Sequence, residues 1–266
     1  MITVVRISKG KSNFFTVEFS NGEQLRVSED MLVRHRLLKG MELSEEDFKK
    51  LQKNTGYDLG VQLAMNYISY QLRSEKEVRS FLKEKEIPAE DRNRIISRLK
   101  DLGVVDDRIY GESYVRTQMR TSDKGPTVVK QQLRQKGLTE ELIEQVITLY
   151  SFDQQLEVAS HVAEKSLRRI HGKSYKETIQ KVRTALMQKG FSGDVISLVM
   201  EDLPFDKQED DEYEALVKEG ERLWRRHQRK APRERDNKIK QSLFQKGFQL
   251  EEIQRFLEEK GLEDEE

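Results

Sequence analysis

The chain of 266 residues has no cysteine, four prolines, 15 glycines and one tryptophan. Without cysteine it can form no disulfide, no thiolate nucleophile and no sulfur-ligated zinc site, and this composition suits a reducing compartment. The scarcity of proline and glycine favours a mostly helical protein. No apolar run approaches the ~20 residues that cross a bilayer, and the first six residues lack the basic-then-apolar order of a signal peptide. We therefore expect a cytoplasmic protein with no membrane segment.

Groups suited to catalysis are also scarce. The four histidines are scattered, and none has metal-ligand spacing near a carboxylate partner: His35, His161, His171 and His227. The adjacent pair Asp106–Asp107 precedes an expected helix, and adjacent residues do not face each other on a helix, so we interpret it as a helix cap rather than an acid–base pair. We predict that the chain is not an enzyme and needs no cofactor or metal.

Charge is abundant but balanced. Charged residues make up 36% of the chain and the hydrophobic class 35%, while the formal net charge is +0. Such a chain can fill several thin cores but not one thick core, which suits short helical bundles because each helix needs only one apolar stripe. Since the net charge is zero, only the distribution of charge can indicate partners.

An internal repeat organises the sequence. A signature of leucine, any residue, glutamine, lysine, glycine and an apolar residue begins at Leu133, Leu186 and Leu243. An earlier copy beginning at Leu82 keeps the lysine but has Glu86 in place of glycine, and the four lysines lie 51, 53 and 57 residues apart. All four copies carry two apolar residues nine and ten positions after the glycine position. This periodicity predicts four related modules.

The signature has the chemistry of a helix end. Its glycine can adopt the left-handed conformation that closes a helix, and its lysine meets the negative end of the helix dipole. We therefore interpret the signature mainly as a helix stop within a three-helix module, rather than as a binding motif. Because Glu86 replaces the glycine, we expect the first module to turn differently, with help from Pro88.

The first residues follow a different period. Apolar residues between Ile2 and Val27 alternate with polar ones, and turn chemistry at Lys9-Gly10-Lys11 and Ser20-Asn21-Gly22 separates them. This pattern predicts a three-stranded antiparallel meander. Capped starts at Ser28 and Ser44 predict two short helices that cover the sheet and end near Gly56.

The predicted fold is mainly α: about four tandem three-helix-bundle repeats forming an elongated curved array, preceded by a small N-terminal β-meander with short helices. A row of this kind presents an extended binding face. The expected divisions are 1–57 for the N-terminal unit and 58–104, 105–152 and 153–205 for the first three repeats. Residues 206–266 would hold an acidic linker over 206–212, the fourth repeat, and an acidic tail that frays from residue 263.

The basic residues gather in two stretches. Residues 222–240 hold nine basic residues against two acidic ones, and residues 116–136 hold six against one. The candidates for binding are Arg116, Arg120, Lys124, Lys130, Arg134, Lys136, Arg222, Arg225, Arg226, Arg229, Lys230, Arg233 and Arg235. They could contact a phosphate backbone, with salt-dependent affinity, or an acidic protein groove, or they could be solvated helix faces. We interpret Trp224, inside the larger cluster, as a core residue rather than a base-stacking platform.

One stretch resembles a known family. The sequence Leu99-Lys-Asp-Leu-Gly-Val-Val-Asp-Asp-Arg-Ile-Tyr-Gly-Glu-Ser-Tyr-Val115 resembles the core motif of the RecX family. The residues from Ser74 to Leu82 are similar to the family's first-repeat entry, although Gly111 stands where alanine is common and Glu86 where glycine is usual. The later repeats and the N-terminal unit are similar to longer members from Gram-positive bacteria.

The resemblance implies a regulator of the recombinase RecA. Members bind the groove of the RecA–DNA filament and generally inhibit its recombinase and co-protease activities, in homologous recombination, DNA repair and the SOS response. The implied partners are RecA and, mainly through the filament, single-stranded and double-stranded DNA. We expect a monomer whose basic faces in the second and fourth repeats turn toward the filament. The competing hypothesis is a stand-alone helical nucleic-acid-binding protein that does not depend on RecA.

Overall fold

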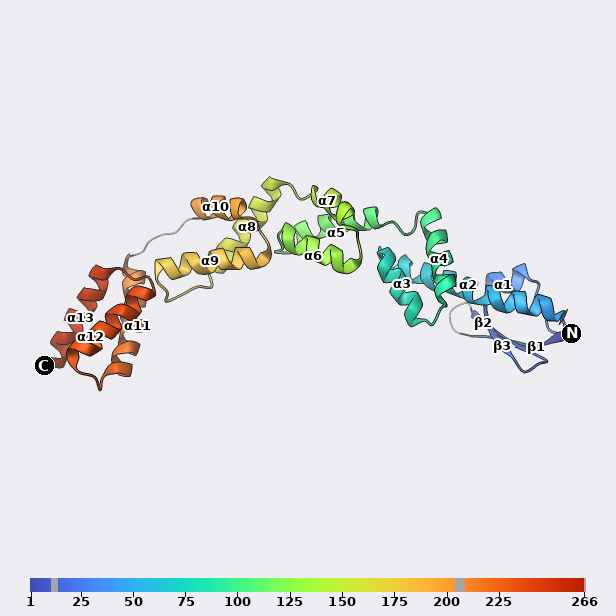
Figure 1. The fold of residues 1–266 in the computed structure, drawn as a ribbon, viewed down its shortest axis with the longest axis horizontal. Helices are drawn as coiled ribbons and strands as arrows, with labels where there is room; N and C mark the ends of the chain where they lie inside the picture. Colours follow the sequence, from blue (N-terminus) through green and yellow to red (C-terminus); the bar gives the residue numbers. More distant parts are fainter. Residues whose placement is uncertain (11–13, 204–208, 266) are drawn as a thin grey trace. The chain divides into compact units, whose positions relative to one another are not determined.

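The computed structural model describes residues 1–10, 14–203 and 209–265, and its chain begins with an antiparallel sheet (Figure 1). The strands lie in the order β3-β2-β1-β4, with bounds Ile2–Lys9 (β1), Phe14–Phe19 (β2), Gln24–Ser28 (β3) and Glu42–Leu43 (β4). The predicted meander is therefore present, but a fourth strand extends it. A strand of two residues is too short for its alternation to be recognised in the sequence, and it is fixed by pairing with Ile2 and Thr3.

Two helices cover this sheet. Helix α1 spans Glu29–Arg34 and α2 spans Glu45–Ser69, and the side chains of Ser28 and Ser44 accept hydrogen bonds from the backbone in their first turns, as expected of caps. The prediction of two short helices ending near Gly56 is wrong for α2, which continues through 25 residues. The glycines in α2 mark close approach instead, because a Cβ at Gly60 would lie 2.4 Å from Ile95 Cδ1.

Three helices make up each following module. Among the described residues, the first module uses the second half of α2 with two further helices, and each of the other three modules has three helices. The bounds are α3 Glu75–Glu84, α4 Ala89–Asp101, α5 Asp107–Thr121, α6 Pro126–Lys136, α7 Glu140–Ile147, α8 Phe152–Leu167, α9 Tyr175–Lys189, α10 Gly193–Asp202, α11 Glu209–His227, α12 Pro232–Gln245 and α13 Leu250–Glu265.

The acidic segments are more helical than expected. Helix α11 begins at Glu209, inside the predicted linker, and α13 reaches Glu265, inside the predicted frayed tail. The rest of the linker prediction, over 206–208, and the last residue of the tail lie outside the described residues.

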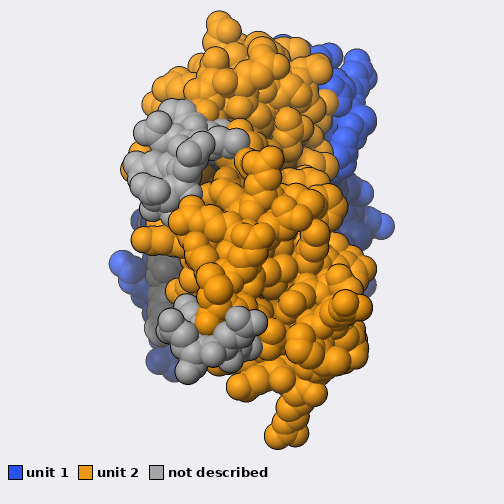
Figure 2. Space-filling model, turned by 90° about the vertical axis from the view of Figure 1, so that its left-hand side faces the viewer, with its two compact units in different colours: residues 1–114, 132–146 blue, residues 115–131, 147–266 orange. Residues whose placement is uncertain are grey.

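The chain forms two compact units (Figure 2). Residues 1–114 and 132–146 make up the first, and residues 115–131 and 147–266 make up the second. The border passes through α5 and α6, so the second repeat contributes to both units. The repeat boundaries expected at 104/105 and 152/153 stay predictions.

The cores are thin and separate, as the composition predicts. One cluster joins the sheet to Phe48 and Leu51 of α2, and others fill the first, third and fourth repeats. The residues nine positions after the glycine position are buried in all four repeats. Ile95, Val146, Val199 and Phe256 are each at most 3% exposed.

The signature closes its helix as expected. Gly137, Gly190 and Gly247 have φ of +94°, +87° and +94°. In each case the next amide donates to the carbonyl of the signature leucine, as in Leu138 N to Leu133 O at 3.2 Å. The expectation that Glu86 turns differently is wrong. Glu86 has φ of +59°, and Ile87 N donates to Leu82 O at 3.0 Å in the same pattern.

Candidate functional site

The signature does more than end a helix: it docks onto the preceding repeat. We call this contact a joint. In the first unit, the buried Ser74 caps α3 by accepting from Glu77 N at 3.2 Å, and its hydroxyl also donates to the carbonyl oxygen of Lys136 at 2.7 Å. The C-terminal end of α6 therefore meets the N-terminal end of α3, where orphan carbonyls and amides satisfy each other and the helix dipoles attract.

Two joints of the same kind lie within the described part of the second unit. Ser174 caps α9 and donates to the carbonyl of Lys246. At the other joint the backbone bonds directly, since Gly125 N donates to Lys189 O at 2.7 Å and Thr127 N donates to Gly190 O at 3.2 Å. The end of each signature helix, α6, α9 and α12, thus abuts the start of the second helix of the repeat before it.

The joints explain where glycine is needed. A Cβ at Gly137 would lie 2.6 Å from Lys76 Cβ, one at Gly247 would lie 2.7 Å from Lys176 Cβ, and one at Gly190 would lie 2.8 Å from Val128 N. A Cβ atom at any of these three positions would overlap its neighbour, so only glycine fits there even where another residue could adopt the positive φ. Glu86 belongs to the first repeat and is exposed, so its turn carries only the cost of a positive φ.

The signature lysines take part in ion pairs. Lys136 Nζ lies 2.7 Å from Glu77 Oε1, Lys246 Nζ lies 3.0 Å from Glu219 Oε1, and Lys189 Nζ lies 3.8 Å from Asp123 Oδ2. Burial tends to raise the pKa of Glu77, but hydrogen bonds from Lys136 and the Ser74 amide, with the charge of Lys136, bring that pKa below its ordinary value. Lys136, a predicted binding residue, is therefore part of a joint.

The adjacent aspartates are caps, as interpreted. Asp106 Oδ1 accepts from Arg108 N at 2.7 Å and from Ile109 N at 3.2 Å, at the start of α5. Asp107 Oδ1 instead accepts from Glu75 N at 2.8 Å, so it caps α3 across the same joint, and burial raises its pKa.

The predicted cluster over 116–136 is spread out. Arg116 and Arg120 lie exposed on α5, Lys124 donates to Gln118 Oε1 at 3.2 Å, and Lys130 is half-buried on α6. Arg134 is exposed and its Nε lies 2.7 Å from Glu140 Oε2. Arg134 and Lys136 belong to the first unit and the other four residues to the second.

The predicted cluster in the fourth repeat is brought together where α11 ends and α12 begins. Four exposed arginines lie there: Arg225, Arg226, Arg229 and Arg233. Two further candidates are engaged locally, because Arg222 pairs with Glu219 at 2.6 Å and Lys230 pairs with Glu234 at 2.7 Å. We call the four exposed arginines the α11–α12 cluster.

Arg235 has a different place from the one expected. It is buried, its guanidinium carbon lies 3.6 Å from the centre of the Trp224 ring, and its Nε lies 3.1 Å from Asp236 Oδ1. Stacking of this guanidinium on a core ring stabilises the fourth repeat. Trp224 is 8% exposed and packs edge-on against Phe256, so its interpretation as core is confirmed.

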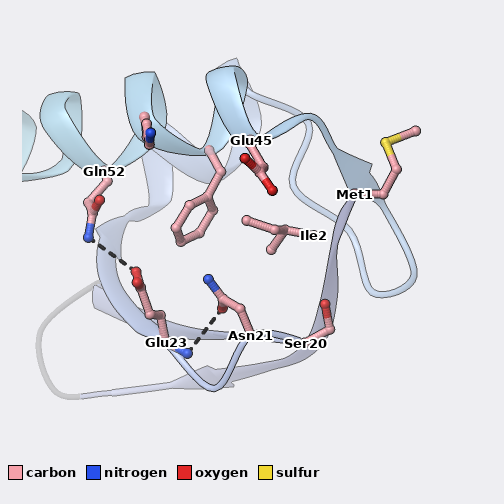
Figure 3. Close-up of a pocket in the computed structure, with 9 residues that line it drawn as sticks. Met1, Ile2, Ser20, Asn21, Glu23, Glu45 and Gln52 are labelled. Carbon is pink, nitrogen blue, oxygen red and sulfur yellow. Dashed lines mark hydrogen bonds between the residues drawn. The ribbon is translucent and has the colours of Figure 1, made fainter.

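A pocket lies beside the sheet, and hydrogen bonds among its polar lining residues hold α2 against the β2–β3 turn (Figure 3). Met1, Ile2 and Phe48 line it together with polar side chains from α2 and the β2–β3 turn. Gln52 Nε2 donates to Glu23 Oε2 at 3.1 Å, and Glu23 N donates to Asn21 Oδ1 at 3.1 Å, which ties α2 to the turn (Figure 3). Within the described residues no group of three histidine or carboxylate side chains could hold a metal ion.

The sequence missed the joints. The capping serine Ser74 and the signature glycines were visible separately, but nothing in their spacing pairs residue 74 with residue 136. The available signal was the occurrence of a capping serine, Ser74 or Ser174, in the repeat before a signature glycine, Gly137 or Gly247. Over the parts of the chain that are described, no helix combines the length and apolar character needed to cross a membrane.

Comparisons with known proteins agree on one family. The model of the first RecX three-helix domain matches residues 61–99, that of the second matches 106–147, and that of the third matches both 153–200 and 209–257. The double match shows that the last two repeats are of one type.

Full-length relatives and solved structures extend the match. A regulatory protein RecX from Enterococcus faecalis is 54% identical over 266 residues, covering all of both chains, and one from Levilactobacillus brevis is 40% identical over 98% of each. A crystal structure of regulatory protein RecX covers 76% of this chain and 100% of its own, with TM-score 0.61 and 31% identity. The RecX structure from Lactobacillus salivarius covers 56% and 96%, with TM-score 0.53 and 40% identity. The chain belongs to the RecX family of regulatory proteins.

Proposed function

We propose that this protein binds the groove of the RecA–DNA filament and inhibits the recombinase and co-protease activities of RecA in recombination, repair and the SOS response. The observation that carries the proposal is the 54% identity to a regulatory protein RecX along the whole of both chains. In this proposal the protein acts in the cytoplasm as a monomer, without catalysis and without a cofactor.

The α11–α12 cluster supports the proposal physically. Four exposed guanidinium groups within nine residues suit a surface of phosphates or carboxylates, and each phosphate contact releases counterions. Arg116 and Arg120, exposed on α5, would add contacts from the second repeat. Lys136 and Arg235 are left out because the joint and the Trp224 core engage them.

Inhibition of ATP hydrolysis by RecA on single-stranded DNA tests the proposal. The protein should inhibit at concentrations well below those at which it coats naked DNA. Reversing Arg225, Arg226 and Arg229 to glutamate should raise the concentration needed for half inhibition by more than about tenfold, since three attractive contacts become repulsive. The matched control reverses three exposed lysines of α2, Lys49, Lys50 and Lys53, and should leave inhibition nearly unchanged.

The two hypotheses predict different outcomes in this assay. A stand-alone nucleic-acid-binding protein would inhibit only where it saturates the DNA and so displaces RecA. An inhibitory concentration equal to the DNA-binding concentration would therefore contradict the proposal. Equal effects of the two triple reversals would contradict the role of the α11–α12 cluster.

A further inference from the structure

Helices α9 and α12 carry the same pattern at equivalent positions, and all of its residues are exposed except the half-buried Lys240. Fourteen, ten, seven and three residues before the signature glycine, the third repeat has Lys176, Gln180, Arg183 and Met187, and the fourth has Arg233, Asn237, Lys240 and Phe244. Each set reads basic, amide, basic and large apolar. Spacings of four, three and four residues place each set along one face of its helix.

Packing does not account for this pattern. Met187 is 65% exposed and Phe244 57% exposed, whereas the core sides of these helices bury Leu186 and Leu243 completely. A single exposed apolar residue is ordinary on a protein surface, but here it recurs at one repeat position beside two cations. The first two repeats have Lys83 and Arg134 at that position.

The cations on these faces are uncompensated. Among the described residues, Lys176, Arg183, Arg233 and Lys240 form no ion pair. Neighbouring lysines on the same helices are paired, because Lys181 Nζ lies 3.2 Å from Glu177 and Lys238 Nζ lies 3.4 Å from Glu234. The free cations are therefore confined to the faces that carry the exposed apolar residues.

The face of α9 leads into a pocket. Arg183 and Met187 line a pocket of about 380 Å³ with Thr127, Phe191 and Ile196. A pocket of this size, with an apolar floor and a few polar groups at its edge, can hold a planar ring. At the other end of α9, the stem of Lys176 packs against Gly247, three residues after Phe244, so the two faces adjoin at a joint.

We propose that α9 and α12 form a track for single-stranded nucleic acid. The four cations hold phosphates, Met187 and Phe244 contact the faces of unstacked bases, and Gln180 and Asn237 hydrogen-bond to either. Single strands offer a phosphate chain together with free base faces, which is the combination of chemistry on these helices. A duplex would use the cations and leave Met187 and Phe244 in water. The inference deepens the proposed function, in which DNA is part of the target, but needs no RecA.

Fluorescence anisotropy of labelled oligothymidylate with the full chain, without RecA and across a salt series, tests the track. Combining Arg183→Ala with Lys240→Ala should weaken binding more than about tenfold and flatten the salt dependence by about 0.7 for each lost contact. Phe244→Ala should weaken binding about fivefold or more and leave the salt slope unchanged, because it removes stacking and no charge. The matched control combines Lys181→Ala with Lys238→Ala, which removes two paired cations from the same helices, and should change affinity by less than about twofold.

Three results would overturn the track. The first is equal affinity of the Arg183→Ala, Lys240→Ala protein and its control. The second is a duplex that binds as tightly as the single strand, together with a Phe244→Ala protein whose affinity for the single strand is unchanged. The third is competition by polyglutamate as effective as by oligonucleotide, which would assign the track to an acidic protein. Since RecA is absent from the assay, failure here leaves the filament proposal standing, and failure of filament inhibition leaves the track standing.

Discussion

The hydroxyl of Ser74 and the backbone carbonyl of Lys136, 62 residues apart in the chain, form a hydrogen bond of 2.7 Å. The same hydroxyl caps α3, so one side chain fixes a helix start and a neighbouring helix end. Ser174 makes the equivalent bond to Lys246 in the second unit. The signature is therefore a helix stop that also joins repeats.

Ser74→Ala should loosen both sides of this joint. The change removes a cap and leaves a partly buried carbonyl without this partner, which together should cost about 2 kcal/mol. Hydrogen exchange should become faster at the start of α3 and also around residues 136–138. Ser44→Ala is the control, because exposed Ser44 caps α2 alone. Faster exchange confined to α3 would show that the bond to Lys136 contributes nothing.

Glu86→Gly should stabilise the protein by about 0.5–1 kcal/mol, because glycine relieves a positive φ at an exposed position. Gly137→Ala should instead destabilise it by about 2 kcal/mol or more, since the added Cβ would overlap Lys76. Urea unfolding of both variants measures the contrast. If the two changes in the free energy of unfolding were opposite in sign and similar in size, backbone conformation alone would govern both positions, 86 and 137.

The sequence predicted the features that depend on local chemistry, except the turn at Glu86, where a residue other than glycine adopts the same positive φ. The alternating residues of β1 to β3, the serine caps and the signature turns depend on local chemistry, and these predictions are confirmed. The length of α2 and the pairing of β4 depend on contacts with distant residues, Ile95 and Ile2, that no local pattern encodes. The burial of Arg235 on Trp224 is of the same kind, since charge counting cannot distinguish a stacked arginine from an exposed one.

Acid should weaken the joint between α3 and α6. Because the pKa of Glu77 in the folded protein lies below its ordinary value of 4.5, its ionised form stabilises the fold above that value, and this contribution is lost as the pH falls through the folded pKa. Glu77→Gln should therefore destabilise the protein at neutral pH and progressively less at pH values below 4.5. Urea unfolding of both proteins at neutral pH and below pH 4.5 measures the difference in the free energy of unfolding between the variant and the unchanged protein. A difference that does not change with pH would contradict this role of Glu77.

Arg235→Ala should lower the stability of the fourth repeat by about 2 kcal/mol, because it removes a desolvated cation–π contact and its packing. Trp224 is the only tryptophan, so its fluorescence during unfolding reports on this repeat. Arg235→Lys should be nearly as unstable as Arg235→Ala, since an ammonium group cannot stack on a ring as a guanidinium does. The control is Arg233→Ala, an exposed change on the same helix, and an equal effect of both alanine changes would rule out the special role of the stack.

A reconstruction of this protein bound to a RecA–DNA filament, by electron cryo-microscopy, tests the central claim most directly. The account predicts density for the helical repeats within the filament groove, with Arg225, Arg226 and Arg229 of the fourth repeat and Arg116 and Arg120 of the second facing RecA or its DNA. Filaments that remain bare at concentrations where the protein inhibits ATP hydrolysis, or density confined to DNA without RecA, would contradict it.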